Sequence, residues 1–304
     1  EPLRVGGKAV VLATGGMGSN PELIAKYSWF APSAYNMNTL TPLQNMGDGL
    51  MMALSAGADD TNIVTCPILA AGARDKAMDS HIGAAGVQPG AIWINKTGRR
   101  FANEGTAENI GDIGPLYGKQ PDGIVWSVLD QANIDRLAEN GSEISIGEFV
   151  VFGRPLDRLR MELDQDVADG VAFAANTPEE LAEKIGVSPE NFAATVAAYN
   201  EACAAGDDKE FFKQEKYLRP LSIPPFYAVA LATGTMGSAG GIRINGNMQV
   251  VDKDYEPIPG LYAVGLDATG LYGDSYNMEV PGAANGFAHT SGRIAGRHFA
   301  DQQA

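Results

Sequence analysis

The sequence predicts an α/β fold in which one domain of strands and helices is interrupted by a second, mixed α+β domain. Residues 8–16 (KAVVLATGG) are typical of a buried parallel strand that ends in a glycine turn. Strand-like segments return at 226–232 and within 242–264, and residues 282–300 predict a final helix. Because the chain leaves this pattern in its middle and resumes it at its end, we expect an inserted domain.

Two helices of the first domain have clear ends in the sequence. Asn20 and Pro21 predict a helix start, because an asparagine side chain caps a helix and proline fits its first turn. Residues 45–58 predict a second helix, with Asp48 as its cap and Gly57 as its end.

The middle of the chain has a different pattern. Residues 90–104 predict a hairpin with its turn at 96–98, and residues 122–130 predict a strand. Residues 177–204 predict two helices, each opened by a hydroxyl residue followed by proline. Residues 233–241 (TGTMGSAGG) are expected to form a glycine loop.

The length of 304 residues fits two domains of roughly 150 residues each. We place residues 1–66 and 233–304 in one domain and residues 67–232 in the inserted domain. Such an insertion favours a binding site at the junction of the domains. Residue 1 is Glu rather than Met, and we expect a further segment to precede it.

Composition argues against two classes of partner. The net charge is −15 and no basic run is longer than Arg99-Arg100, so no nucleic acid partner is expected. No apolar run approaches the roughly 20 residues of a membrane-spanning helix, so we expect no membrane span. Cys66 and Cys203 fit no metal-ligand spacing, and no metal site is predicted. A disulfide between them and two free thiols are both open readings.

Two segments of small residues are candidates for contacting a nucleotide. The first follows the strand at 8–16, where ligands of doubly wound sheets bind, and consists of Ala13, Thr14, Gly15 and Gly16. The second opens the last helix, whose first N–H groups attract an anionic group, and consists of Ala283, Ala284, Asn285 and Gly286. The alternative for the first is a tight turn that binds nothing, and for the second it is close packing of the helix on a sheet.

Seven segments have a recognisable order along nearly the whole chain: GKAVVLATGGMGSN (7–20), MGDGLMMALSAGAD (46–59), INKTGRRFANE (94–104), IVWSVLDQ (124–131), GTMGSAGG (234–241), IPGLYAVGLDATG (258–270) and NGFAHTSGRIAG (285–296). In this ordered set the chain resembles the flavoprotein subunit family of fumarate reductase and succinate dehydrogenase, including soluble flavocytochrome-type fumarate and urocanate reductases. The resemblance covers only the C-terminal part of that family.

The resemblance implies an FAD cofactor, a flavin domain split by a capping domain, and hydride transfer to or from a carbon–carbon bond. It implies as partners a small-molecule substrate, the missing N-terminal half of the flavin domain, and a haem group or other electron donor. Besides the two segments of small residues, it assigns cofactor contacts to Thr235, Gly265 and Asp267, with Asp267 near the ribityl chain of the flavin.

The cationic residues that bind a dicarboxylate in this family are not carried over. Cys66 stands where the family has a substrate-binding His before a proline. Glu108 stands at the family's proton-donating Arg, and residues 277–279 stand at its substrate-clamping Arg. Without these cations, fumarate and succinate are not the expected substrates.

Two tyrosines are the first candidates for the proton donor that the missing arginine would supply. We rank Tyr276 first, Tyr272 second and Glu108 third as the proton donor, and we keep Cys66 in the catalytic set. A tyrosine donates a proton or polarises a carbonyl, and a buried glutamate has a raised pKa. The alternative for each tyrosine is packing with a bonded hydroxyl.

These residues predict a flavin-dependent reductase of an activated C=C bond in an enone, an acrylate or a steroid-like substrate. Hydride would come from flavin N5 and a proton from a side chain. The competing reading is a non-catalytic C-terminal fragment, or a substrate-binding relative, that holds no FAD on its own.

Overall fold

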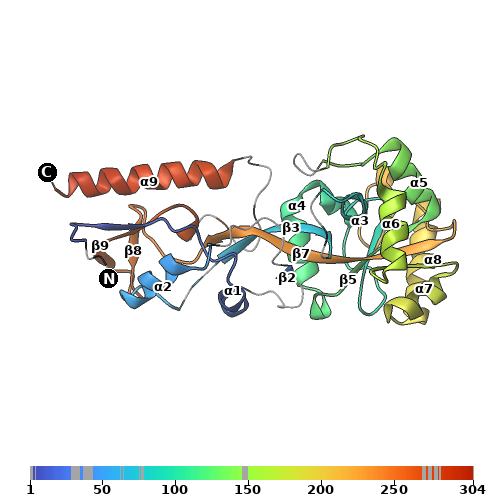
Figure 1. Cartoon of the computed structure of the whole chain (residues 1–304), viewed down its shortest axis with the longest axis horizontal. Coiled ribbons are helices and arrows are strands. Elements are labelled where there is room, and N and C mark those ends of the chain that lie inside the picture. Colours follow the sequence, from blue (N-terminus) through green and yellow to red (C-terminus); the bar gives the residue numbers. More distant parts are fainter. Residues whose placement is uncertain are drawn as a thin grey trace. The chain divides into compact units, whose positions relative to one another are not determined.

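The structure is a computed structural model. It describes all residues except 1–2, 4, 29–34, 37–43, 62, 64, 75, 77–78, 146–149, 269–271, 273–275, 277–279, 281 and 304, and it describes the backbone alone at 35–36, 65–72, 110 and 234–236. The chain divides into two compact units. The first comprises Glu1–Pro32, Leu40–Leu69 and Thr235–Ala304, and the second comprises Ser33–Thr39 and Ala70–Gly234. Both contain helices and strands, which confirms the α/β prediction (Figure 1).

The first unit is built on a three-stranded sheet. Its strands lie in the order β1 (Val10–Leu12), β9 (Pro257–Ala263) and β8 (Gln249–Val251). β1 pairs with β9 in parallel and β8 pairs with β9 antiparallel. The opening strand of the sequence therefore lies beside a strand that follows it by nearly the whole chain.

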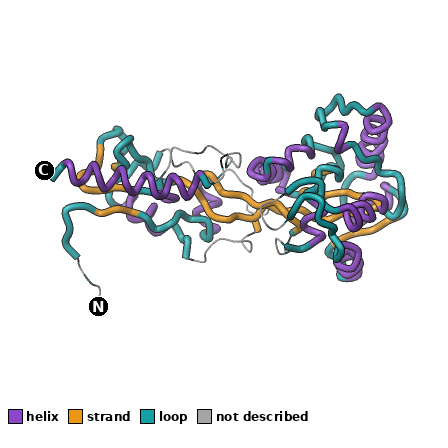
Figure 2. Tube along the Cα trace, turned by 90° about the horizontal axis from the view of Figure 1, so that it is seen from above, coloured by secondary structure: helices purple, strands orange, loops and turns teal. Residues whose placement is uncertain are grey.

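Helix α9 (Ala283–Asp301) is the final helix that the sequence predicts, and it packs along this sheet (Figure 2). Its buried Ala295 joins Met248, Tyr262 and Val264 in one apolar cluster. Most other α9 side chains are half-buried or exposed. The short turn η5 (Gly265–Asp267) leads out of β9 and also contacts α9.

The ends of the other two helices test the capping predictions. α1 (Pro21–Tyr27) begins after Asn20, whose side chain accepts from the N–H groups of Glu22 and Leu23, as predicted. α2 (Asp48–Ser55) begins after Gly47 rather than Asp48, so the predicted cap is wrong. Gly47 adopts φ +87° and supplies no side-chain cap of its own.

The second unit contains a six-stranded sheet. Its path is β2 (Tyr35–Asn36), β7 (Phe226–Gly240), β5 (Val125–Asp130) and β4 (Ile92–Asn95), while β3 (Thr65–Ala73) and β6 (Ala172–Ala175) also pair with β7. The predicted turn after β4 is present, because Gly98 N–H donates to Asn95 at 2.9 Å. The strand beyond that turn is reduced to one bridge, between Ile94 and Arg100.

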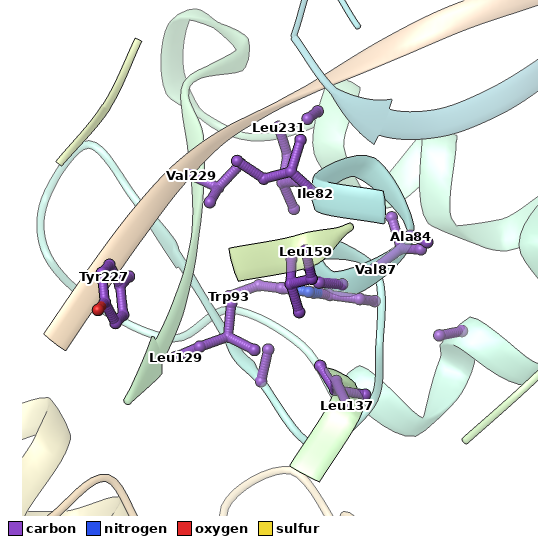
Figure 3. Packing of buried hydrophobic residues seen from close by; sticks show 14 of the residues in the cluster. Ile82, Ala84, Val87, Trp93, Leu129, Leu137, Leu159, Tyr227, Val229 and Leu231 are labelled. Atoms are coloured by element: carbon purple, nitrogen blue, oxygen red, sulfur yellow. The ribbon is translucent and has the colours of Figure 1, made fainter. Parts of the chain in front are cut away.

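Helices cover both faces of this sheet because alternate strand residues are apolar on both sides. Figure 3 shows Trp93 of β4 among Leu137 of α5 (Gln131–Asn140), Leu159 of α6 (Leu159–Ala168) and residues of α3 (His81–Gly86). The other face carries α7 (Pro178–Ile185) and α8 (Pro189–Ala205), which pack against Ile92, Ile94 and Val128. The remaining elements are η2 (Glu104–Glu108), α4 (Ile110–Gly118), η3 (Pro121–Gly123) and η4 (Glu215–Tyr217).

The predicted glycine loop at 233–241 is wrong. Residues 226–240 form one strand, β7, whose Thr233 and Gly234 pair with Tyr35 and Asn36 of β2. Backbone pairing with neighbouring strands keeps these glycines in β7, although glycine by itself disfavours a strand.

Candidate functional site

The first cluster of candidate residues lies in the first unit, where β1 ends. The buried carboxylate of Asp267 accepts hydrogen bonds from the backbone N–H groups of Thr14, Gly15 and Gly16, the last two at 3.2 Å. The Thr14 hydroxyl lies 3.1 Å from the same carboxylate. Three N–H groups of the predicted nucleotide-binding turn are thus held by one side chain, and Ala13 precedes them in an exposed position.

Helix α2 and strand β7 complete this cluster. The N–H of Gly49 donates to the Thr14 hydroxyl at 3.0 Å, and the N–H of Met17 donates to the Ser238 hydroxyl at 2.8 Å. Gly16 adopts φ +81°, and a Cβ there would lie 2.7 Å from the Ser238 carbonyl oxygen. Glycine is therefore required at this position, both for the conformation and for the close approach.

The second cluster lies at the start of α9. Gly282 is its N-cap and supplies no side-chain cap, and the described first turn contains no acidic residue. The Tyr276 hydroxyl accepts a hydrogen bond from the Ala284 N–H at 3.1 Å, and the Tyr272 ring lies 4.9 Å from the Tyr276 ring. Asn285 and Gly286 are exposed on the same turn.

The α9 start has the character that an anionic part of a cofactor needs. Its first turn consists of small residues without an acidic side chain, and the Tyr276 hydroxyl accepts one of its N–H groups. The partial positive charge of the helix lies at this end. The residues present therefore fit the binding of FAD at this point. The described contacts do not test which atoms of FAD they would touch, and the cofactor contacts stay predictions.

Other predicted residues have different surroundings. The Gly265 N–H donates to the Ser291 hydroxyl of α9 at 2.9 Å. Cys66 lies on β3 and Thr235 on β7, and their side chains are outside the described part of the chain. The predicted region at 277–279 is also outside it. Cys203 carries a free, half-buried thiol.

Glu108 lies in the second unit, at the end of η2. One of its carboxylate oxygens, Oε1, accepts from Lys216 Nζ at 2.7 Å and from the Tyr217 hydroxyl at 2.5 Å. These hydrogen bonds, first from Lys216 and then from Tyr217, lower the pKa of Glu108. A raised pKa was expected only for a buried Glu108, and this condition is not met, because the side chain is 47% exposed and has two donors.

Neither partner of Glu108 could be identified from the sequence. Lys216 and Tyr217 stand in a loop-like stretch, 108 and 109 positions away from Glu108. The sequence shows at this point only a basic residue next to an aromatic one. This pair occurs in many loops and does not indicate a contact with a distant carboxylate. Only the folded chain shows that the two side chains share one carboxylate oxygen.

A buried ionic cluster fixes the segments that carry these residues. The guanidinium of Arg100 donates to Glu104 at 2.7 and 2.9 Å and to Asp208 at 2.9 Å, and Lys213 Nζ lies 3.3 Å from Glu104. Burial works against ionising Glu104, yet Lys213 and Arg100 still lower its pKa. Burial lowers the pKa of Lys213. Arg100 thus ties the segment that follows β4 to η2 and to Asp208.

The described residues lack a metal site and a membrane-spanning helix. In this part of the chain, no three or more His, Cys, Asp or Glu side chains gather in a way that would hold a metal ion. No described helix is both long enough and apolar enough to cross a bilayer.

The sequence model of the FAD binding domain matches residues 1–281. The chain belongs to the FAD binding domain family. This confirms the family resemblance and the prediction of FAD as its cofactor. A vinyl phenol reductase of Lactiplantibacillus plantarum is 35% identical in sequence to this chain. The matched region covers 96% of this chain and 60% of the reductase. A protein named probable fumarate reductase, from Shewanella frigidimarina, is 32% identical over 97% of the chain and 45% of that relative.

A solved structure has the same fold as this member of the FAD binding domain family. It is the 3-ketosteroid delta1-dehydrogenase of Sterolibacterium denitrificans, with a TM-score of 0.69 and 22% identity, covering 97% of this chain and 53% of that one. At that identity the likeness concerns the fold alone. The chain spans 60% or less of the length of these relatives.

Proposed function

We propose that this chain is part of a flavin-dependent reductase that adds hydrogen across the C=C bond of a small molecule such as an enone, an aromatic acrylate, a vinyl phenol or a steroid-like compound. The observation that carries the proposal is the hydrogen bond from the Ala284 N–H to the Tyr276 hydroxyl, 3.1 Å long. That bond uses a lone pair of the hydroxyl oxygen. The hydroxyl hydrogen is not consumed by it and can be donated to a substrate.

The neighbouring residues support a proton-donating or polarising role for Tyr276. The side chain is buried, and the Tyr272 ring 4.9 Å away restricts its orientation. The hydroxyl lies at the N-terminus of α9, where the partial positive charge of the helix favours developing negative charge on a bound oxygen. Tyr272 is proposed as the second wall of the same site.

The residues at the family's cationic positions support a substrate without two carboxylates. Cys66 and Glu108 stand where the fumarate reductases have a histidine and an arginine, and neither is a cation. The similarity to a vinyl phenol reductase agrees with this proposal, because a vinyl phenol carries its C=C bond on a ring and has no carboxylate.

We propose that residues 1–66 and 233–304 belong to the flavin domain and residues 67–232 to the capping domain. The turn at residues 13–16, held by Asp267, and the start of α9 would bind FAD. When bound, FAD supplies the hydride. The residues of the chain orient the substrate, provide the proton and exclude water.

The proposed function also requires a nucleotide-binding segment of the flavin domain. The chain spans 60% and 45% of the two curated relatives, so the active protein is proposed to contain that segment and to receive electrons from haem or another donor. The same coverage favours the second candidate function, in which these 304 residues bind no FAD alone and are not catalytic.

The first experiment is a visible absorption spectrum of the purified protein together with its intact mass. A flavin spectrum at a mass above that of these 304 residues supports the proposal. A flavin spectrum at this mass removes the need for the additional segment. A colourless protein at this mass supports the second candidate function.

The second experiment tests the substrate class. The flavin-loaded protein is reduced without oxygen and mixed with 4-vinylphenol, 2-cyclohexenone, cinnamate or fumarate. We expect the oxidised flavin absorbance to return with one or more of the first three and not with fumarate. Return with fumarate alone would contradict the proposal.

A further inference from the structure

The short turn η5 is hydrogen-bonded to both segments that are proposed to bind FAD. The carboxylate of its last residue, Asp267, accepts from the N–H groups of residues 14–16 at the end of β1. The N–H of its first residue, Gly265, donates to the Ser291 hydroxyl of α9 at 2.9 Å. All of these residues belong to the first unit. One short turn therefore connects a segment from the start of the chain with a segment from its end.

The hydroxyl of Ser291 makes hydrogen bonds in both directions. It accepts from Gly265, and it donates to the helix backbone, where the Phe287 carbonyl lies at 2.6 Å and the Ala288 carbonyl at 3.2 Å. A Cβ on Gly265 would lie 3.5 Å from the Cβ of Ala288, so the helix and the turn are in close contact. Both Ser291 and Gly265 are buried. Removal of the hydroxyl would therefore leave a buried N–H group without its acceptor.

The backbone of η5 is fixed to neighbouring segments of the same unit. Just before the turn, the Val264 N–H donates to the Leu12 carbonyl at 3.0 Å. Within the turn, the Asp267 carbonyl accepts from the Ile242 N–H at 2.9 Å. These backbone bonds do not depend on the side chains of Asp267 and Ser291. The turn is therefore a fixed point, from which the two side-chain contacts set the places of residues 14–16 and of α9.

A cofactor that contacts two segments needs them at a fixed separation. If the segments move independently, binding must first order them, and the cost of ordering lowers the affinity. Residues 14–16 and the start of α9 come from opposite ends of the chain, so the chain between them does not fix their separation. The contacts of η5 provide this connection before the cofactor binds.

We propose that Ser291 is a positioning residue for FAD, which keeps α9 in place relative to the turn that Asp267 holds. Ser291 acts through Gly265 and does not touch the cofactor, because its hydroxyl is buried and already has its partners. The inference rests on the proposed binding of FAD at these two segments and not on the proposed substrate. A serine inside a helix does not indicate such a role in the sequence, because its partner lies 26 positions away.

The first test measures the affinity for FAD. FAD is removed from the flavin-loaded protein and added back, and the quenching of its fluorescence gives the Kd. We expect Ser291→Ala to bind FAD roughly tenfold more weakly, which corresponds to the net value of about one hydrogen bond. Ser291→Thr keeps a hydroxyl that bonds helix carbonyls, and it should retain most of the affinity.

Ser142→Ala is the matched control for this test. It removes a buried serine hydroxyl of the second unit, which donates to the Val151 carbonyl at 2.6 Å. The substitution is therefore chemically the same and also removes a hydrogen bond. Because Ser142 has no contact with η5 or with the two segments among the described residues, its Kd for FAD should not change.

The visible circular dichroism of the bound flavin separates positioning from a general loss of stability. The shape of this spectrum depends on how the protein surrounds the flavin ring, whereas unfolding only lowers its intensity. At saturating FAD, Ser291→Ala should change the shape, and Ser291→Thr and Ser142→Ala should keep it. A weaker spectrum of unchanged shape in Ser291→Ala would mean that Ser291 only stabilises the fold, and it would overturn the inference.

Hydrogen exchange gives a measurement that needs no substitution. In the unsubstituted protein, addition of FAD should slow the exchange of amides in residues 14–16, in η5 and in the first turn of α9 together, because these segments are connected. Slower exchange in only one of the two segments that η5 connects would overturn the inference.

The outcomes also separate this inference from the proposed function. An unchanged Kd in Ser291→Ala, or an equal loss of affinity in Ser142→Ala, overturns the inference. If the Kd of Ser291→Ala is unchanged while a C=C compound reoxidises the reduced flavin, the proposed function stands and the inference fails. If Ser291→Ala weakens FAD binding as expected but no C=C compound reoxidises the reduced flavin of the original protein, the inference stands and the proposed function fails.

Discussion

The hydroxyl of Thr14 lies 3.1 Å from both carboxylate oxygens of Asp267, although the two residues are 253 positions apart. This contact joins the end of the first strand to the turn that follows β9. It means that the beginning and the end of the chain form one local structure. The turn of small residues exists in its observed form only when the C-terminal part of the first unit has folded.

Removing the Asp267 carboxylate should therefore destabilise the first unit. Asp267→Ala leaves the N–H groups of Gly15 and Gly16 without their acceptor, and we expect a loss of about 3 kcal/mol in the free energy of unfolding. Urea denaturation followed by circular dichroism measures it. Asp254→Ala, at an exposed position, is the control and should stay within about 0.5 kcal/mol of the original protein. An equally small loss for Asp267→Ala would contradict the anchoring role.

Alanine substitutions at two glycines with positive φ distinguish the cost of backbone strain from the cost of a steric contact. Gly16 has φ +81° with the Ser238 carbonyl in the way of a Cβ, whereas Gly57 has φ +96° with nothing within 4 Å of one. Gly57→Ala should cost roughly 1–2 kcal/mol from conformation alone. Gly16→Ala should cost clearly more, since it adds the steric contact. Thermal denaturation of both variants shows which substitution costs more stability. Equal losses would show that β7 moves away from the added Cβ without an energetic penalty.

Acid should weaken the second unit through the buried ionic cluster. Burial works against the ionised form of Asp208, but the hydrogen bond and charge of Arg100 lower its pKa below the usual 3.8. Its contribution to stability is thus present above the unfolded value and is lost as pH falls through the folded one. Asp208→Asn removes this titration, so its unfolding free energy should fall less steeply between about pH 5 and pH 2. Urea midpoints at several pH values measure the slopes, and the exposed Asp301→Asn should run parallel to the original protein.

Tyr276→Phe tests the proposed chemistry. If the hydroxyl donates a proton or polarises the substrate, we expect the rate of substrate-driven flavin reoxidation to fall by about 10²-fold or more. Stopped-flow absorbance measures this single step. Tyr255→Phe is the matched control, because Tyr255 is 58% exposed in the same unit, and its rate should not change. An undiminished rate in Tyr276→Phe would remove this residue from the mechanism.

The sequence predicted best those features that depend on neighbouring residues. Thr177 and Ser188 cap α7 and α8, accepting from the N–H groups of Glu180 at 3.2 Å and of Asn191 at 3.3 Å. Phe192, Val196 and Tyr199, which are spaced three or four positions apart, are the buried residues of α8. Capping and helical periodicity involve residues three or four positions apart, which a sequence displays directly.

The failures involve partners that are distant in sequence. The extension of β7 to Gly240 depends on pairing with other strands, which no local signal shows. The charge state of Glu108 depends on Lys216 and Tyr217, and burial alone was the wrong basis for its pKa. At the end of β1, glycine composition pointed to a nucleotide-binding turn but did not show that Asp267 holds its N–H groups.

The edge position of β1 has a consequence for solubility. Among the described strands of its sheet, β1 has β9 as its one neighbour, and its Val10 and Val11 are 56% and 50% exposed. An apolar edge of this kind accepts a strand from any other chain that reaches it. Production of the chain by itself should therefore be limited by aggregation that grows with concentration, and a lysine in place of Val10 would act as a gatekeeper against it.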